Sequence, residues 1–207
     1  GNLTLTSTGS TISLNNALVS AGTVTMSAST GLTLSNSTLT GAGNISLQGG
    51  SALSLASGMN ITSSAGNITL AGSSITANNG ALTLSSNGSI TVSNSLSSVG
   101  ALTMTANSGI TLANSVTASG VVDLDADLDN NGTGDFTLSS GSLSTSNNAL
   151  TVTANDMTLT GTSTLNSGTG STTINVSDGG SLGIGFSSGF GMNLTTTEAS
   201  NITGTGD

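Results

Sequence analysis

The 207-residue chain contains no Lys, Arg, His, Cys, Pro, Trp or Tyr, and its formal net charge is −9. Without His, Cys, Lys or Tyr, the usual nucleophile–base pairs and zinc sites cannot be built, so we expect no enzymatic activity. A chain without cations is repelled by phosphate backbones and by anionic lipid surfaces, so we also expect no nucleic-acid binding. No apolar run is long enough for membrane insertion or for a signal peptide.

A short pattern, Gly-x-apolar-Thr/Ser-apolar, returns from the first residue onward, with one Thr replaced by Asp. Its copies start at Gly1, Gly22, Gly43, Gly66, Gly80, Gly100 and Gly120, at spacings of 21, 21, 23, 14, 20 and 20 residues. Side chains alternate between the two faces of a strand, so the apolar pair points inward and the Thr between them points outward. Each copy therefore predicts a short strand that follows a glycine corner.

Further apolar positions follow each strand. A second pair lies about eight residues on, at Ile12/Leu14, Leu32/Leu34, Leu53/Leu55, Ile90/Val92 and Ile110/Leu112. A third position follows at Leu18, Leu39, Ile61, Leu96 and Val116. Such a unit cannot bury its apolar face alone, but stacked units can.

These units predict an all-β chain that forms a parallel β-solenoid over residues 1–207 as a single domain. We expect three strands per coil of about 20 residues, nine to ten coils, and essentially no helix, because no 3.6-residue apolar period persists. Outward ladders of Thr, Ser and Asn suit this geometry, whereas stacked like charges repel, which fits a charged content of 4%. Disorder is the alternative, but 34% hydrophobic residues and a positive mean hydropathy argue against it.

An acidic insertion at 123–135 interrupts the pattern. It carries five of the nine acidic residues: Asp123, Asp125, Asp127, Asp129 and Asp135. The apolar alternation continues as far as Leu128, so the first four aspartates are expected to face outward together.

Part of this insertion resembles a calcium-binding loop. Asp127-x-Asp129-x-Asn131-Gly132-x-x-Asp135 matches positions 1, 3, 5, 6 and 9 of an EF-hand loop. Leu138 stands at position 12, where the bidentate Glu would be, so an EF-hand proper is excluded. Two interpretations stay open, a plain solvated loop and a Ca²⁺ site on the solenoid. The candidate ligands are Asp125, Asp127, Asp129, Asn131 and Asp135.

The segment 179–191 is dense in glycine and contains Phe186 and Phe190. It is interpreted either as a flexible joint or as a contact site in which the two rings pack on a neighbour. Separately, Thr-x-Thr pairs such as Thr103/Thr105 indicate an ice-binding face as a minor alternative, although Ser and Asn interrupt these ladders.

The Gly-x-Leu-Thr-Leu unit with its following Gly-Ile-Thr-Leu resembles the repeat region of filamentous-haemagglutinin-like secreted adhesins, exported by two-partner or autotransporter routes. The segments Ser181–Phe186 and Gly191–Ile202 resemble an element of the same long proteins, with Ala199 where that element has Leu. The resemblance implies a right-handed parallel β-helix, an extracellular or cell-surface location, and a role as stalk, fibre or adhesin.

The expected function is therefore that of a structural extracellular solenoid. Because Gly1 opens directly on a repeat instead of on Met, the chain is expected to be a processed product or a piece of a longer one. Both ends read as coils without a blocking helix or charged edge, so the chain is expected to continue covalently or to stack end-to-end with itself. The alternative is a module that binds surface glycans or another host-surface ligand.

Overall fold

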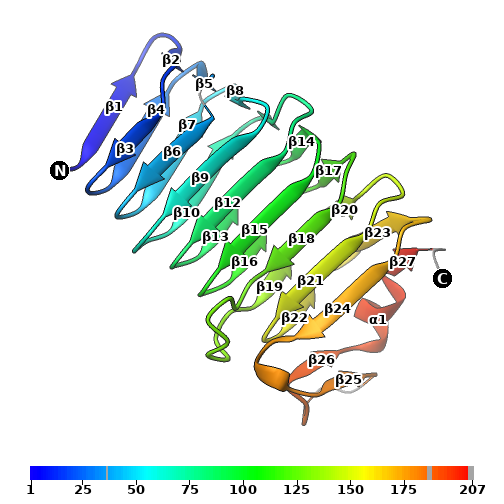
Figure 1. Cartoon of the computed structure of the whole chain (residues 1–207). Helices are drawn as coiled ribbons and strands as arrows, with labels where there is room; N and C mark the ends of the chain where they lie inside the picture. The colour runs from blue at the N-terminus through cyan, green and yellow to red at the C-terminus, as the bar shows by residue number, and fades with distance from the viewer. Residues whose placement is uncertain (36, 186–187, 205–207) are drawn as a thin grey trace.

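The computed structural model describes residues 1–35, 37–185 and 188–204. They form a three-sided β-solenoid in which successive turns, here called coils, stack along one axis (Figure 1). Every strand pairing in it is parallel, and the only helical elements of the described residues are a five-residue α-helix and a three-residue 3₁₀ turn. The predicted fold class is confirmed.

Each side of the prism is one parallel sheet with one strand per coil. Sheet A consists of β1 (Leu3–Ser7), β4 (Val24–Ala28), β7 (Ile45–Gly49), β10 (Ile68–Gly72), β13 (Ile90–Val92), β16 (Ile110–Leu112), β19 (Phe136–Leu138) and β22 (Met157–Leu159). Sheet B consists of β2 (Ile12–Leu14), β5 (Gly31–Leu34), β8 (Ala52–Leu55), β11 (Ile75–Thr76), β14 (Leu96–Val99), β17 (Val116–Ala118), β20 (Ser142–Ser144), β23 (Thr164–Gly168) and β27 (Ile202–Gly204). Sheet C consists of β3 (Leu18–Ser20), β6 (Thr38–Gly41), β9 (Met59–Ser63), β12 (Leu82–Ser86), β15 (Leu102–Ala106), β18 (Val122–Asp125), β21 (Leu150–Ala154) and β24 (Thr172–Val176).

The inward apolar positions of the three sheets form one continuous core. In β12, for example, Leu82 and Leu84 are fully buried and Thr83 between them points out, as strand alternation requires. At the amino-terminal end the same positions are only partly buried, including Leu3 and Leu5, because in the described residues no coil covers them. Stacking therefore supplies the burial that a single unit lacks.

The repeated Gly-x-apolar-Thr-apolar motif changes side along the chain. The copies starting at Gly1, Gly22, Gly43 and Gly66 form strands of sheet A, whereas those at Gly80, Gly100 and Gly120 form strands of sheet C. The 14-residue spacing between Gly66 and Gly80 marks the change. Thr69 thus pairs with Thr91 of the next coil, although its motif equivalent is Thr83. The motif identifies strands but not the side of the prism on which they lie.

The solenoid has eight complete coils, where the repeat length predicted nine to ten. The acidic insertion adds to one coil, so that Ile110 and its register partner Phe136 are 26 residues apart. Residues after β24 do not form a further coil of the same kind. They form a 3₁₀ turn η1 (Ser177–Gly179), a two-stranded sheet of β25 (Leu182–Ile184) and β26 (Met192–Leu194), and the helix α1 (Thr196–Ser200), before β27 rejoins sheet B.

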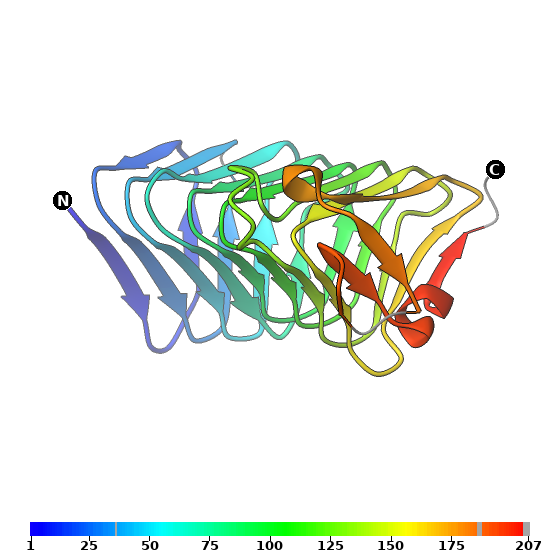
Figure 2. The same cartoon turned by 90° about the horizontal axis from the view of Figure 1, so that it is seen from below.

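In Figure 1 these last elements lie at the end of the rod opposite the amino terminus, and Figure 2 shows α1 and β27 at the carboxyl-terminal end. We call the described residues 177–185 and 188–204 the carboxyl-terminal cap. Its short helix is the main departure from the expected all-strand chain. No helix among the described residues reaches the length and apolar content that a bilayer span needs.

Candidate functional site

The acidic loop projects from the corner between β18 and β19. Asp123 and Asp125 lie on β18 and point outward, in register with Thr103 and Thr105 of the preceding coil. The next alternating aspartate, Asp127, does not follow them, because its side chain is fully buried. The expectation that four aspartates face outward together is therefore wrong for Asp127.

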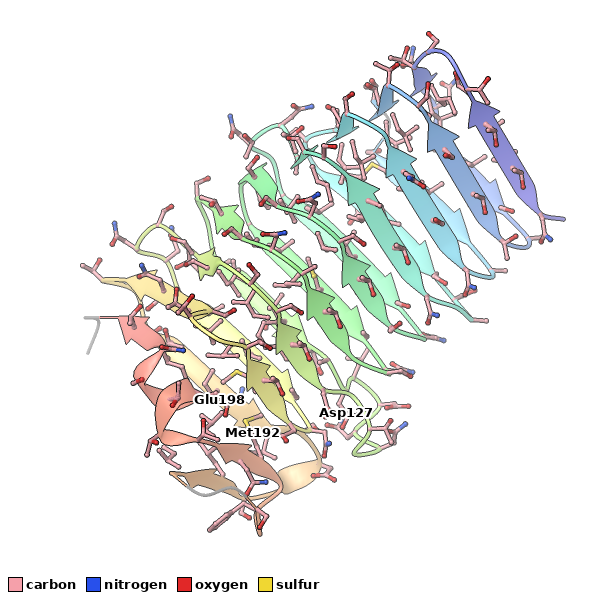
Figure 3. The ribbon with its side chains drawn as sticks, turned by 180° about the vertical axis from the view of Figure 1, so that it is seen from behind. Asp127, Met192 and Glu198 are labelled. Carbon is pink, nitrogen blue, oxygen red and sulfur yellow. The ribbon has the colours of Figure 1, made fainter. Side chains whose placement is uncertain are left out.

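Asp127 is the hydrogen-bonding centre of the loop (Figure 3). Its Oδ1 accepts the amide of Asn131 at 3.2 Å, and its Oδ2 accepts the amide of Gly132 at 3.0 Å and the hydroxyl of Ser177 at 2.6 Å. Burial acts to raise the pKa of this carboxyl, but the bonds from Ser177 and the two amides outweigh it and hold the pKa below its ordinary value. The loop is folded around this one charge.

The loop also connects distant parts of the chain. Ser177, which donates to Asp127, lies in η1, two coils farther along the axis, and the amide of Asp178 donates to Asn130 Oδ1 at 3.3 Å. The intervening coil turns from β21 to β22 through only two residues, Asn155 and Asp156. The acidic loop therefore spans that short corner and joins the coil that contains β18 to the corner that follows β24.

The remaining candidate calcium ligands have separate partners. Asp129 Oδ2 accepts the side-chain amide of Asn131 at 2.9 Å. Asp135 Oδ1 accepts the side-chain amide of Asn155 at 2.9 Å and the backbone amide of Asp156 at 3.1 Å.

Asp125 stands apart from the loop interior. Its Oδ1 accepts the amide of Asp127 at 3.2 Å, while burial, followed by repulsion from Asp123 and Asp127, raises its pKa. Within the described ranges, no three acidic side chains gather as a metal-binding group. Calcium binding at this loop stays a prediction.

A second cluster of polar contacts lies at the carboxyl-terminal edge of sheet A, on β22. Asp156 Oδ1 accepts the amide of Met157 at 2.9 Å and that of Asn193 at 3.1 Å. Glu198 Oε1 accepts the amide of Leu159 at 3.1 Å. Two carboxylates thus bond the amides of β22 that would face a following strand.

Glu198 is positioned by the first turn of α1. Its Oε2 accepts the amide of Thr195 at 3.0 Å and the Thr195 hydroxyl at 2.9 Å, while the Glu198 amide donates to Thr195 Oγ1 at 3.2 Å. This is a capping box, in which the N-cap and the third helical residue satisfy each other's donors. The sequence analysis missed Glu198, although Thr195-x-x-Glu198 is the spacing that signals such a cap.

Apolar side chains of the cap close the end of the core. Met192 and Leu194 of β26 are 0% and 2% exposed, and β26 contacts β22. Figure 3 labels Met192 and Glu198, which both belong to this end of the rod.

The predicted contact residues Phe186 and Phe190 belong to the same region. Phe186 lies outside the described residues. The ring of Phe190 packs within the chain, over Gly183 of β25, where an added Cβ would lie 2.3 Å from Phe190 Cδ2. A backbone–side-chain pair between Phe190 and Asn193 closes the turn into β26. The ring remains 37% exposed, so a contact with a neighbour is a prediction that these bonds leave open.

The described residues enclose no pocket. Comparisons with protein-family models, curated proteins and solved structures found no match for this chain.

Proposed function

We propose that this chain is a structural, extracellular β-solenoid, a stalk segment of a secreted bacterial adhesin-like protein. The observation that carries the proposal is one outward ladder of sheet A that stays nearly constant from coil to coil. The middle outward ladder of sheet A holds Thr in seven of eight coils: Thr4, Thr25, Ser46, Thr69, Thr91, Thr111, Thr137 and Thr158.

The ladder bears on function because its residues all carry a hydroxyl group but are spread along the rod, one in each coil, and do not gather at one site. Neutral hydroxyls at strand spacing, about 4.8 Å, suit a pleated surface and carry no repulsion along the stack. A ladder that repeats in this way presents a hydroxyl in each coil along the rod. Regular stacking of this kind extends the rod without building a local site, which supports a spacer role. The resemblance to adhesin repeats supports a location outside the cell.

Location is tested on intact cells, and binding is tested with the purified chain. We expect protease added to intact producing cells to remove the protein while a cytoplasmic marker survives, and we expect the purified chain to give no specific hits on a glycan array. Protection of the protein until lysis would contradict the extracellular role. Specific glycan hits would replace the stalk with the binding-module alternative.

The register weakens one argument against an ice-binding face, because a single Ser interrupts the Thr ladder of sheet A. The neighbouring outward column is irregular, however: Thr6, Ser27, Gln48 and Ala71 follow one another. A single regular column is not a two-dimensional array of hydroxyls, so we do not propose ice binding.

A further inference from the structure

The amides of the last strand of sheet A, β22, have different hydrogen-bond acceptors from those of the sheet A strands before it. Within the stack, the first amide of each sheet A strand donates to a carbonyl of the next coil, as Ile110 does to Asp135 O at 3.0 Å and Phe136 to Asp156 O at 2.9 Å. In the described part of the chain no strand pairs with the outer edge of β22. Its Met157 and Leu159 amides donate instead to side-chain carboxylates, those of Asp156 and Glu198.

A carboxylate at such an edge closes it. A strand edge recruits another strand because its donors and acceptors are unpaired. A carboxylate accepts and offers no donor in return, and a hydrogen bond to a charged acceptor is stronger than one to a carbonyl. An incoming strand would have to displace both carboxylates. It would also have to displace Met192 and Leu194, which fill the end of the core, and α1 beyond them (Figures 1 and 2).

Without the cap, β22 would suit one partner that is itself present in the molecule. The first strand, β1, presents Leu3-Thr4-Leu5, and β22 presents Met157-Thr158-Leu159. Stacking β1 of a second copy on β22 would repeat the apolar–Thr–apolar register found at most internal steps, including that between β19 and β22. Leu3 and Leu5 are only partly buried, so this contact would complete their burial.

We propose that the carboxyl-terminal cap is an autoinhibitory contact that prevents head-to-tail addition of a second copy of this chain. Glu198 is the residue that fixes this contact, because its one carboxylate accepts the Leu159 amide and also accepts the Thr195 amide and hydroxyl at the first turn of α1. The expectation that both ends are free of a blocking helix is thereby corrected at the carboxyl-terminal end. This inference depends on the geometry of β22 and the cap, and not on the cellular location of the protein.

The matched variants are Glu198→Gln and Glu198→Ala, each also combined with Met192→Ala. Glutamine keeps an oxygen that can accept the Leu159 amide and is a favoured third residue of a capping box. Alanine removes both functions. We expect at least ten-fold faster hydrogen exchange of the Leu159 amide in Glu198→Ala than in the parent chain or in Glu198→Gln. Far-UV circular dichroism checks that the sheets remain.

Sedimentation velocity and negative-stain microscopy then measure assembly. The parent chain and Glu198→Gln should sediment as one species across a hundred-fold concentration range. Glu198→Ala/Met192→Ala should grow with concentration into linear rods. Adding Thr4→Pro should abolish that growth. The Leu3 amide donates toward the second coil, so the neighbouring Thr4 amide points along the axis away from that coil, where a strand stacked on β1 would accept it.

Three results would overturn the proposal. One is fibre formation by the parent chain. Another is an unchanged exchange rate of the Leu159 amide in Glu198→Ala. The third is a double variant whose Leu159 amide exchanges rapidly but which stays monomeric at every concentration. Fibres that persist with Thr4→Pro would show that the amino-terminal edge is not the partner.

Discussion

At the scale of single residues, alternation explains most side chains and fails where a side chain makes specific bonds. Leu82, Thr83 and Leu84 point as the pattern predicts, because a strand has only two faces. Asp127 occupies an outward position by the same count, yet it is buried and accepts a hydrogen bond from Ser177. Ser177 lies 50 residues farther along the chain, so it could not be recognised as the partner of Asp127 from sequence spacing. Local periodicity carries no information about partners from other coils.

Asp127 is expected to stabilise the folded loop. Asp127→Asn replaces a charged acceptor of three hydrogen bonds with an amide that has one accepting oxygen, so we expect a loss of roughly 1.5–3 kcal/mol. Chemical denaturation at pH 7 measures it, with Asp123→Asn, at an exposed position of β18, as the control. The calcium-site prediction is tested separately, by comparing the stability of the parent chain in millimolar calcium and in a chelator, where stabilisation by calcium would support it. Equal stability of the parent chain and Asp127→Asn at pH 7 would contradict this account of the loop.

The lowered pKa of Asp127 sets the sign of its pH dependence. The unfolded chain, with an ordinary aspartate pKa, binds this proton more readily than the folded protein does. The contribution of Asp127 is therefore present above the ordinary aspartate pKa and is lost as the pH falls through the lowered folded value. The difference between the parent chain and Asp127→Asn should accordingly shrink in acid.

Asp125 should behave in the opposite way. Burial, then repulsion from Asp123 and Asp127, raises its pKa, so its ionised form destabilises the fold at neutral pH. Asp125→Asn keeps an oxygen for the Asp127 amide and removes the charge. We expect Asp125→Asn to have a higher denaturation midpoint than the parent chain at pH 7. We expect the two midpoints to be equal in acid, where Asp125 of the parent chain is protonated in both the folded and the unfolded state. A lower midpoint at pH 7 would show that the charge is needed.

At the scale of elements, the three strands per coil could be predicted, but their assignment to sheets could not. All three sides of the prism need a glycine-rich corner and an apolar–polar–apolar strand, so one motif serves sheet A in the copies up to and including Gly66 and sheet C in those from Gly80 onward. The capping box at Thr195 and Glu198 was readable in the sequence. Its bond to Leu159 was not, because it joins residues 39 apart.

Corner glycines differ in how closely the chain passes them. A Cβ on Gly49, at the end of β7, would lie 1.8 Å from the Ala52 carbonyl oxygen, whereas a Cβ on Gly9 would meet nothing within 4 Å. Because a backbone atom cannot yield as a side chain can, we expect Gly49→Ala to cost roughly 1–3 kcal/mol in unfolding free energy. Gly9→Ala is the control, with an expected change near zero. Equal effects of the two would contradict this corner geometry.

At the scale of the whole molecule, the described residues form a rod whose two ends differ chemically. Eight coils at strand spacing make a prism of about 40 Å. The amino-terminal coil leaves its inward leucines partly buried, whereas carboxylates and buried apolar side chains close the edge of sheet A at the other end. Composition and repeat were enough to predict the rod. The difference between its ends follows from contacts of Asp156 and Glu198 that no periodicity encodes.

The coil-to-coil register is the central claim, and paired cysteines test it most directly, because the chain has no cysteine of its own. Thr69 and Thr91 are register partners on neighbouring strands, and strand spacing lies within the Cα range that a disulfide bridges. Thr69 and Thr83 are equivalent in the repeat but lie on different sheets. Under mild oxidation, Thr69→Cys/Thr91→Cys should form an intramolecular disulfide and Thr69→Cys/Thr83→Cys should keep free thiols. The reverse result would contradict the solenoid described above.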